Sequence, residues 1–399
     1  MSKKIGMLLD NEFPPDLRVE NEMRTLAEAG YDVHLLCYDF SGHKPVFEIF
    51  NKGITIHRIN VSKQFHNKFN AMALSIPIYF LFWKKRAKDF VDQFKIDVIH
   101  VHDLRLAQVG CWLKKKFNIP YILDLHENYP AALRFYAFSN SFPGNLLISV
   151  KRWKEYEKDQ VAKADAIITV IEEMGGRIHS LGVDENKIFV IPNYINVDTF
   201  DYQKLEIKID RKEDEILLFY SGGFDRHRGL KTVIHAMNRL KFLNPNIKLH
   251  LVGRGKTEKN LKDLVNKLDL LNVIFHGWQE ERAIPSFIEA CDIGIVPHLK
   301  NEHTDFTIPH KLFQYLFKRK PVIVSDCNPL KRLVEEMEAG LVFNSGDDRD
   351  LSEKILTLVN HQDLRNQMSW KGYNAVITKY NWKTSASELK RLYNTLLNL

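Results

Sequence analysis

Short runs of β-branched and other apolar residues alternate with longer amphipathic stretches along most of this chain. This alternation is typical of a parallel β-sheet whose strands are connected by covering helices. Strands are predicted in the first half at residues 5–10, 32–38, 97–102, 121–126, 166–170 and 188–193, and in the second half at 215–223, 247–253, 272–277, 292–298, 321–326 and 340–344. The sequence therefore predicts an α/β protein with two doubly wound units in series. Ligands of such sheets bind outside the carboxyl ends of the strands.

Residues 196–215 separate the two series of strands, because they are polar and have no strong periodicity. A chain of 399 residues suits two domains of roughly 150 to 200 residues each. We expect an N-terminal domain over residues 1–197 and a second domain over residues 198–375, with the active site between them.

Charge and cysteine content argue against a nucleic-acid binder and against a zinc protein. The net charge of +7 is mildly basic, and the cations are interleaved with aspartates and glutamates. This distribution argues against a dedicated nucleic-acid binder, which usually concentrates its positive charge. Cys37, Cys111, Cys291 and Cys327 stand far apart, without a C-x-x-C pair or a histidine at metal-ligand spacing. We expect reduced thiols, no structural zinc, no signal peptide before the first strand and a cytoplasmic location.

The stretch YSGGFDRHRGLKTVIHAM places Ser221, Gly222 and Gly223 at the end of a predicted strand, and Arg228 and Gly229 at the start of a helix. Glycines let backbone amides approach an anion, and the amino end of a helix carries partial positive charge. The turn is a candidate diphosphate site, to which Arg228 would add a bidentate charge. A plain strand-to-helix turn explains the glycines equally well, since the dinucleotide spacing G-x-G-x-x-G is absent.

The stretch TDFTIPHKLFQYLFKRKPVIVSD, residues 304–326, predicts a loop, a helix opened by Pro309 and a β-strand. Proline suits the first turn of a helix, and the amides that follow it would then face a ligand. Lys311 and Gln314 lie three positions apart on one helix face, where they could bind a phosphate and a ribose hydroxyl. A surface lysine and a solvated glutamine are the alternative. Four neighbours are predicted to be core: Leu312, Phe313, Tyr315 and Leu316.

The motifs LVGRG, HGW, CDIGIVPH and IPHKLFQYLFKRKPVIVSD, in this order, resemble the nucleotide-sugar half of retaining glycosyltransferases with the GT-B fold, in glycosyltransferase family four. DNEFPPDLRVENEMRTLAEAGYDVHLL and YILDLHENYP resemble the acceptor half of the bacterial surface-polysaccharide branch, and PNYINVDTF resembles its domain connection. The resemblance covers nearly the whole chain. It implies two Rossmann-like domains facing each other across a cleft. It also implies that a C-terminal helix, residues 376–399 with Trp382, crosses back to the first domain.

The resemblance also implies a donor pocket, position by position. Arg228 falls where the family has a lysine or arginine at the donor diphosphate, whereas Gly223 falls where the family usually has an arginine. Gln314 replaces a glutamate that commonly binds the donor ribose, and Phe306 replaces one that contacts the donor sugar. Three neighbours could substitute for the latter: His303, Thr304 and Asp305. The implied donor set is Gly222, Gly223, Arg228, Gly253, Arg254, Gly277, Trp278, Thr307, Ile308, Pro309, Lys311 and Gln314.

His126 matches the family's histidine beside the transferring sugar. The sequence alone would favour a histidine satisfied at a strand end, whereas the resemblance favours a catalytic role. Asp103, Asp124 and Glu127 are neighbours that could receive acceptor hydroxyls, although aspartates near strand ends are often only helix caps. We assign Asp103 and Glu127 to the acceptor. The implied catalytic set is His126, Arg228 and Lys311.

The implied reaction transfers a sugar from a UDP- or GDP-linked donor to a hydroxyl of a glycan or lipid-linked acceptor, with the anomeric configuration retained. Amides, Arg228 and Lys311 would stabilise the charge that grows on the leaving diphosphate. No cofactor is expected, and no D-x-D motif is placed to hold a divalent ion against a diphosphate. No carboxylate is obviously placed as a covalent nucleophile, so the family implies front-face attack assisted by the leaving phosphate.

Two stretches join aromatic residues to clustered cations: 61–90, which contains Lys84, Lys85, Arg86 and Lys88, and 134–158. Apolar side chains beside cations suit the surface of an anionic bilayer at the inner face of a membrane. A buried helix with one solvated end would show the same pattern, and both interpretations stay open. The longest apolar stretch, 71–83, contains Pro77 and falls short of the roughly 20 residues that span a bilayer.

Two rival functions remain. A sugar-nucleotide epimerase of similar shape would be expected to supply carboxylates as acid and base. A catalytically silent homologue that binds a sugar nucleotide or a partner enzyme is the alternative from another class, and Gln314 and Phe306 motivate it.

Overall fold

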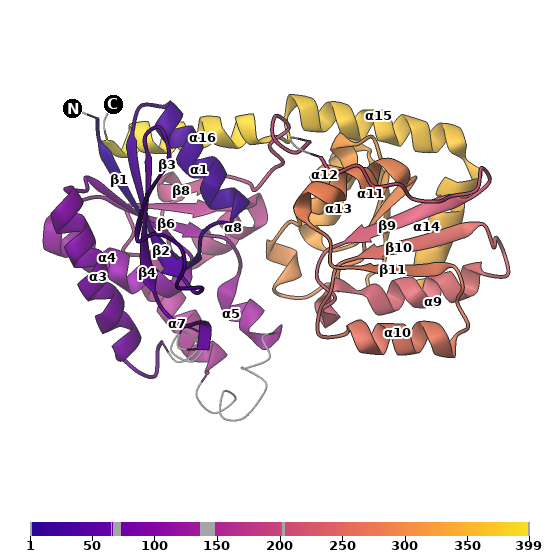
Figure 1. Cartoon of the computed structure of the whole chain (residues 1–399), viewed down its shortest axis with the longest axis horizontal. Helices are drawn as coiled ribbons and strands as arrows, with labels where there is room; N and C mark the ends of the chain where they lie inside the picture. Colours follow the sequence, from indigo (N-terminus) through magenta and orange to yellow (C-terminus); the bar gives the residue numbers. More distant parts are fainter. Residues whose placement is uncertain (1, 65, 67–72, 136–147, 202–203, 398–399) are drawn as a thin grey trace. The chain divides into compact units, whose positions relative to one another are not determined.

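The computed structural model describes residues 2–64, 66, 73–135, 148–201 and 204–397. The chain divides into two compact units: unit 1 is Met1–Asn193 with Ser385–Leu399, and unit 2 is Tyr194–Thr384. Each unit has its own, largely parallel sheet covered by helices (Figure 1). The predicted α/β class with two doubly wound, Rossmann-like units is confirmed.

The sheet of unit 1 has eight strands within the described residues, and all neighbours are parallel except the edge pair β3 and β4. Its order is β3 (Phe47–Asn51), β4 (Ile54–Asn60), β2 (Asp32–Asp39), β1 (Lys4–Glu12), β5 (Val98–His102), β6 (Tyr121–Leu125), β7 (Ala166–Thr169) and β8 (Ile188–Val190). The sequence analysis predicted no strand at β3 or β4. The chain switches direction across the sheet between β1 and β5, which is where ligands of such sheets bind.

Helix α1 (Leu17–Glu28) begins where the Asp16 side chain accepts a hydrogen bond from the amide of Val19 at 3.1 Å. It ends before Gly30, whose φ of +91° suits a glycine at that position. The described part of unit 1 also contains the helices α3 (Ile78–Phe94), α4 (Ala107–Phe117), α5 (Tyr129–Ala132), α7 (Val150–Val161) and α8 (Glu172–Ser180).

The C-terminal helix α16 (Trp382–Leu397) completes the core of unit 1 from Ser385 onward. Leu389, Leu392 and Tyr393 are fully buried among residues of α1 and the first strands, and Figure 1 shows α16 in yellow alongside α1. The last helix of the chain therefore stabilises the unit that the first strand begins.

The sheet of unit 2 is entirely parallel within the described residues. Its order is β11 (Val273–Gly277), β10 (Ile247–Val252), β9 (Ile216–Ser221), β12 (Ile293–Val296), β13 (Val322–Ser325) and β14 (Gly340–Phe343). The switch of direction lies between β9 and β12, so the loops after these two strands flank the expected ligand position.

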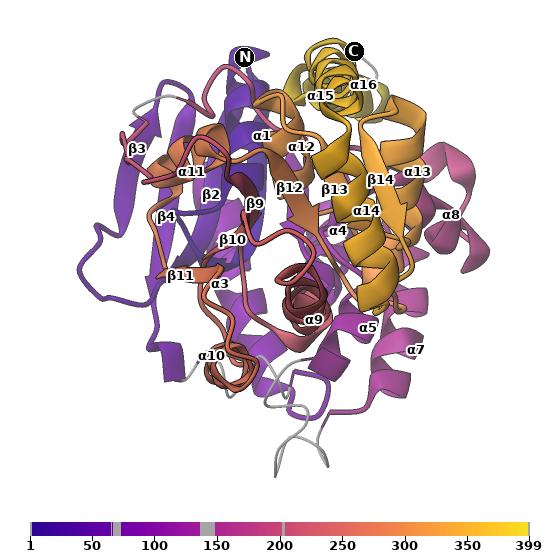
Figure 2. The same ribbon diagram turned by 90° about the vertical axis from the view of Figure 1, so that its right-hand side faces the viewer.

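Seven helices of unit 2 are described: α9 (Leu230–Leu240), α10 (Glu258–Lys267), α11 (Ile284–Ala290), α12 (Lys311–Phe317), α13 (Asn328–Met337), α14 (Asp348–Asn360) and α15 (Gln362–Thr378). Helices α9 and α14 lie next to each other (Figure 2). Apolar side chains of both helices are buried in one core with those of the strands. The four residues of α12 predicted to be core are all fully buried.

None of the described helices is both long and apolar enough to cross a membrane. The two cationic and aromatic stretches of the sequence fall partly outside the described residues, at 65, 67–72 and 136–147.

Candidate active site

Three glycine turns lie side by side at the carboxyl end of the sheet of unit 2. The amide of Gly222 donates to the carbonyl of Val252 at 2.9 Å, and the amide of Gly253 donates to the carbonyl of Gly277 at 2.7 Å. Gly222 has a φ of +133°, and a Cβ atom there would lie 2.7 Å from Nζ of Lys311. The structure therefore brings together three glycines of the expected donor set: Gly222 from the candidate diphosphate turn, and Gly253 and Gly277 from the other two turns.

Lys311 is the first residue of α12, and its side chain is buried against an aromatic ring. The residue is 9% exposed, and its Nζ lies 3.7 Å from the centroid of the Tyr220 ring. No carboxylate of the described residues forms an ion pair with it. Burial, and then the charge of Arg228, lower the pKa of Lys311 well below its usual range. An anionic ligand would supply the missing negative charge.

Arg228 brings a second cation to the same end of the sheet. It ends the 3-10 helix η5 (Arg226–Arg228), and its Nη1 lies 3.0 Å from Nε2 of His298, just after β12. Its Nε is buried without a hydrogen-bond partner, and within the described part of the chain it has no ion-paired carboxylate. Burial and the charge of Arg228 lower the pKa of His298, and that of His303 to about 4. Both imidazoles are therefore neutral near pH 7 and leave the cations uncompensated.

The helix expected to open at Pro309 begins two residues later, at Lys311, with His310 as its N-cap. The amide of Leu312 donates to the carbonyl of Pro309, and the amide of Phe313 donates to the carbonyl of His310. The prediction that the amides after Pro309 face a ligand is therefore wrong for these two. Short 3-10 bonds satisfy them within the first turn.

Gln314 lies on α12 and is only 8% exposed, so the alternative of a solvated glutamine, like that of a surface lysine at position 311, is excluded. Among the suggested substitutes for the family glutamate, Asp305 accepts a hydrogen bond from the amide of Asn328 at 2.9 Å. The hydroxyl of Thr304 donates to the carbonyl of Leu299 at 2.7 Å. These two side chains are therefore engaged within the protein.

The outer residues of the expected donor set lie around the same loops. The guanidinium of Arg254 lies 5.5 Å from the ring of Trp278, which is 59% exposed. The Thr307 hydroxyl donates to the carbonyl of His303 at 3.4 Å, and Ile308 is almost buried. Gly223 follows Gly222, and its carbonyl accepts a hydrogen bond from the hydroxyl of Tyr220 at 2.8 Å.

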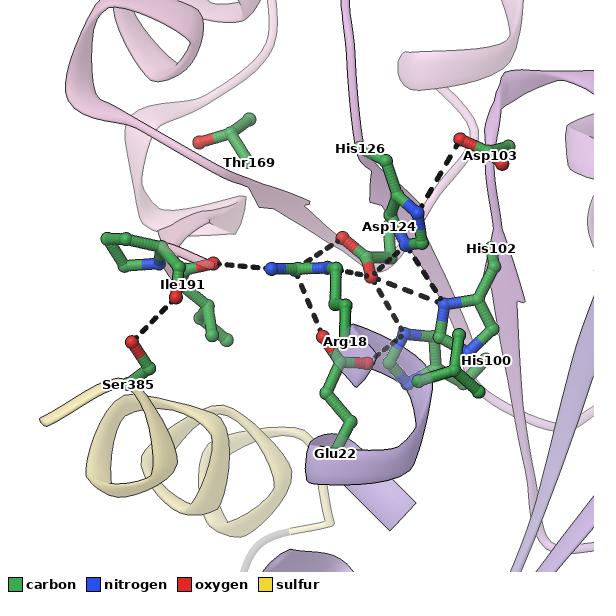
Figure 3. Close-up of polar contacts among 12 residues, drawn as sticks. Arg18, Glu22, His100, His102, Asp103, Asp124, His126, Thr169, Ile191 and Ser385 are labelled. Carbon is green, nitrogen blue, oxygen red and sulfur yellow. Dashed lines mark hydrogen bonds and ion pairs between the residues drawn. The ribbon is translucent and has the colours of Figure 1, made fainter. Parts of the chain in front are cut away.

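In unit 1, the carboxylate of Asp124 is fully buried near the end of β6, and a bidentate ion pair holds it. Arg18, from α1, donates to Asp124 from Nε at 3.0 Å and from Nη2 at 2.8 Å (Figure 3). Nη1 of the same guanidinium donates to the carbonyl of Ile191 at 2.9 Å. Burial opposes the charge on Asp124, but Arg18 and then His126 outweigh it, and the pKa of Asp124 lies well below its usual range.

His126 connects this buried ion pair to the partly exposed surface. Its Nε2 lies 2.9 Å from Asp124 Oδ2, and its Nδ1 lies 3.8 Å from Asp103 Oδ1 (Figure 3). Burial opposes a charge on His126, but the carboxylates of Asp124 and Asp103 outweigh it and raise the pKa of His126 to about 10. The structure thus brings together His126, Asp103 and Asp124, and Glu127 follows in the chain.

Besides Arg18, further residues of the network were not expected from the sequence. Glu22, one turn after Arg18, is fully buried with Oε1 3.0 Å from Arg18 Nη2. His100 lies with Nε2 3.6 Å from Glu22 Oε2, and its Nδ1 is 2.9 Å from the hydroxyl of Tyr393 on α16. The C-terminal helix therefore contributes a side chain to the network.

Glu22, His100, His102 and Asp124 place four potential metal-ligating atoms within 4.8 Å of one another. The guanidinium of Arg18, however, already contacts both carboxylates of this group. Because Arg18 supplies the positive charge between them, we assign the group as an ion-pair network and not as a metal centre.

Known proteins share both the sequence pattern and the fold. The family described as Glycosyl transferases group 1 matches residues 201–375, and Glycosyltransferase Family 4 matches residues 18–199. An uncharacterized glycosyltransferase of Methanocaldococcus jannaschii is 26% identical over 384 residues, covering 95% of this chain and 94% of the relative. Phosphatidyl-myo-inositol mannosyltransferase of Mycobacterium leprae is 21% identical over 376 residues, which cover 94% of this chain and 88% of that relative.

Solved structures show the same fold at low identity. Sucrose-phosphate synthase from Thermosynechococcus elongatus has a TM-score of 0.81 at 17% identity, with 99% of each chain covered. Anabaena HepE in complex with UDP-glucose has a TM-score of 0.73 at 13% identity, with 99% of this chain and 100% of that chain covered. The sequence matches and the two Rossmann-like units confirm that this chain belongs to glycosyltransferase family 4 and is a glycosyltransferase of the GT-B fold.

Proposed function

We propose that this glycosyltransferase moves a sugar from a UDP- or GDP-linked donor to a hydroxyl of a glycan or lipid-linked acceptor, with retention of anomeric configuration and without a metal ion. The observation that carries the proposal is a pair of basic side chains with no carboxylate partner among the described residues: Lys311, which is buried, and the half-buried Arg228, whose Nε is buried without a hydrogen-bond partner. A donor diphosphate has the charge and the oxygen atoms that such a pair lacks. The UDP-glucose complex of HepE, which has a similar fold, supports this class of donor.

The chemistry that follows from this site is stabilisation of the leaving group. Negative charge grows on the diphosphate as the bond to the sugar breaks, and fixed cations at that position lower the barrier. Lys311 and Arg228 take the electrostatic role that a divalent ion has in other transferases. The turn at Gly222 lets the backbone come close to the same oxygen atoms, because no Cβ occupies that space.

On the acceptor side, we assign His126 to the transferring sugar and Asp103 with Glu127 to the acceptor hydroxyls. The side chains of His126 and Asp103 are 18% and 20% exposed, whereas Asp124 behind them has no exposure. Asp124 is not suited to attack the sugar as a nucleophile, because Arg18 and His126 already engage its oxygen atoms. This arrangement supports attack on the donor by the acceptor hydroxyl from the same face, with the leaving phosphate taking the proton.

We further propose that the acceptor is part of bacterial surface-polysaccharide or glycolipid assembly, at the inner face of the membrane. Helix α3 exposes Ile78 and Leu81 by 51% and 61%, and the same helix carries the cations at positions 84–86. The ammonium groups of Lys84 and Lys116 lie 5.9 Å and 5.6 Å from the ring of Trp112, on α4. Apolar and cationic side chains together suit an anionic bilayer. Co-sedimentation with anionic vesicles, absent for zwitterionic vesicles and weakened by Leu81→Glu, would support this; equal binding to both would contradict it.

The test of the transfer reaction is release of the nucleotide from UDP- and GDP-linked sugars, in EDTA, with a bacterial membrane lipid extract as acceptor. We expect release from one nucleotide class, dependence on the extract, and a product whose anomeric proton coupling matches that of the donor. Arg228→Ala should abolish the release. An inverted product would contradict retention. A donor that binds but is never consumed would instead favour the catalytically silent homologue.

A further inference from the structure

We propose that Arg18 and Glu22 of α1 are positioning residues for the transfer reaction: they hold Asp124 so that His126 is fixed between Asp124 and Asp103 at the edge of the acceptor site. This inference rests on the proposed function, because it takes His126 and Asp103 as the groups that meet the substrates. Figure 3 shows the chain of contacts from Glu22 through Arg18 and Asp124 to His126.

The first step of the argument is geometric. Arg18 binds both oxygen atoms of Asp124, and Asp124 Oδ2 in turn lies 2.9 Å from Nε2 of His126. A planar guanidinium on both oxygen atoms fixes the plane of the carboxylate, and that plane sets the direction of the histidine ring. His126 Nδ1 then points toward Asp103. The orientation of the partly exposed ring of His126 is therefore determined by Arg18, which is 4% exposed.

The second step is a count of charges. The connected network has four acids, Asp10, Asp103, Asp124 and Glu22, and three cations, Arg18, Arg105 and His126. One carboxyl group must therefore be protonated for the buried network to be neutral. Burial, and then the charge of Asp124, raise the pKa of Glu22 to about 8, so the proton resides on Glu22 at neutral pH. When Glu22 is neutral, Asp124 is the only one of these two carboxyl groups that forms an ion pair with Arg18.

The groups that face Glu22 come from every element packed against it. Arg18 lies on α1, His100 on β5, Asp124 on β6 and Tyr393 on α16, and His126 acts on it through its charge. Burial lowers the pKa of His100 to about 4, which makes this imidazole a neutral neighbour. Above pH 8 an ionised Glu22 would compete with Asp124 for Arg18.

The third step is backbone strain at the exposed end of the network. Asp103 has a φ of +68° and a ψ of 151°, a region that residues with a Cβ rarely occupy. The amide of Asp103 donates to the carbonyl of Asp124 at 2.8 Å. Asp124, which Arg18 binds, therefore also fixes the backbone of the strained Asp103. Strain of this kind persists where the surroundings fix a side chain for function.

The test compares two bidentate arginine–carboxylate pairs of unit 1. Arg18→Lys keeps the charge but loses the fork that fixes Asp124. Arg177→Lys is the matched control, because Arg177 binds Glu157 through Nη1 at 2.9 Å and Nη2 at 2.5 Å on helices α8 and α7. We expect Arg18→Lys to lower kcat about 10- to 100-fold, because misplacing a reacting group by about 1 Å lowers the rate by up to about 100-fold. The KM for the donor should stay within about twofold of the wild-type value, because Arg18 is not part of the donor site. Arg177→Lys should lower Tm but leave kcat unchanged.

An active wild type in which Arg18→Lys retains kcat, as Arg177→Lys does, overturns the inference and leaves the proposed function intact. A folded wild-type protein that transfers no sugar from any donor overturns both this inference and the proposed function. If Arg18→Lys does not fold, Glu22→Gln provides the second measurement, since its amide has the shape of a protonated carboxyl group. We expect kcat of the wild type to fall as pH rises through about 8, where Glu22 ionises, and Glu22→Gln to lack this fall. The same alkaline fall in both proteins would contradict a role for Glu22.

Discussion

Nζ of Lys311 lies 3.7 Å from the centroid of the Tyr220 ring, in a place where no carboxylate of the described residues compensates its charge. A cation over an aromatic ring gains about 0.5 to 2 kcal/mol, which does not offset the loss of water around an ammonium group. This relationship is unfavourable in the free protein and becomes favourable when an anion arrives. We therefore regard it as the structural signature of the donor site.

The first prediction concerns Lys311→Met. Removing one charge-assisted contact to a diphosphate costs about 1.5 to 3 kcal/mol, so the Kd for UDP should rise by about 10- to 100-fold. The Tm of the free protein should not fall, because the variant removes a buried charge without a partner. Calorimetric titration with UDP and a melting curve measure the two effects.

Lys318→Met is the matched control, at the C-cap of α12, directly after its last residue. The ammonium group of Lys318 contacts the carboxylates of Asp201 and Glu289, so it already has partners. This variant should lower Tm slightly and bind UDP as the wild type does. Loss of UDP binding in both variants would show that α12 as a whole, and not the charge of Lys311, is required.

The second prediction concerns protons. Burial and Arg228 lower the pKa of Lys311 in the free protein, and a bound diphosphate would raise it again. Binding of UDP should therefore take up protons at pH values between the pKa of Lys311 in the free protein and its pKa in the complex, and the affinity should weaken as pH rises through that range. Titrations in buffers of different ionisation enthalpy measure the uptake. If the wild type and Lys311→Met take up the same number of protons when UDP binds, the proton is taken up by another group and not by Lys311.

The third prediction compares two neighbouring glycines. Gly222 has a positive φ, and a Cβ there would meet Nζ of Lys311 at 2.7 Å, whereas a Cβ at Gly223 would meet only Asp225 Oδ2, at 3.2 Å. Gly222→Ala should cost about 1 to 3 kcal/mol of unfolding free energy through backbone strain. Gly223→Ala should lower the unfolding free energy by a smaller amount. Urea unfolding measures the unfolding free energy of both variants. An equal loss in the two variants would argue against a special backbone conformation at Gly222.

The fourth prediction is the pH dependence of stability at His126. Its pKa rises from 6.5 to about 10 in the folded protein, so the folded state holds the proton more tightly than the unfolded chain. The resulting stability is fully present below pH 6.5 and is lost as pH rises through about 10. The difference in unfolding free energy between the wild type and His126→Gln should therefore shrink between pH 6 and pH 10. A difference that stays constant across this range would mean that His126 is not held by the two carboxylates.

Apolar periodicity predicted most of the fold, because strands buried on both faces appear as short β-branched runs. The edge hairpin of β3 and β4 was missed. Its outer strand exposes Phe47 and Ile49 by 54% and 73%, so it lacks the continuous apolar run of a buried strand. The available signal was the turn at Lys52 and Gly53 between two β-rich segments.

The sequence revealed less of the network in unit 1, because its members come from separate elements. His100 and His102 are two residues apart on β5, so they share one face of the strand, and His102 pairs in register with Asp124 on β6. Histidines inside an apolar strand were therefore a usable signal for a buried polar group. The approach of Arg18 and Glu22 depends on how α1 packs on the sheet, which no local pattern specifies.

The measurement that tests the central claim most directly is a melting-temperature screen with UDP-, GDP- and dTDP-linked sugars in EDTA. A ligand that binds only the folded state at a hundredfold excess over Kd stabilises it by about 2.7 kcal/mol. We expect one nucleotide class to raise Tm of the wild type, and the double variant Arg228→Ala, Lys311→Met to show no rise. A folded wild type that no donor stabilises, or a rise that persists in the double variant, would contradict a donor diphosphate held by these two cations.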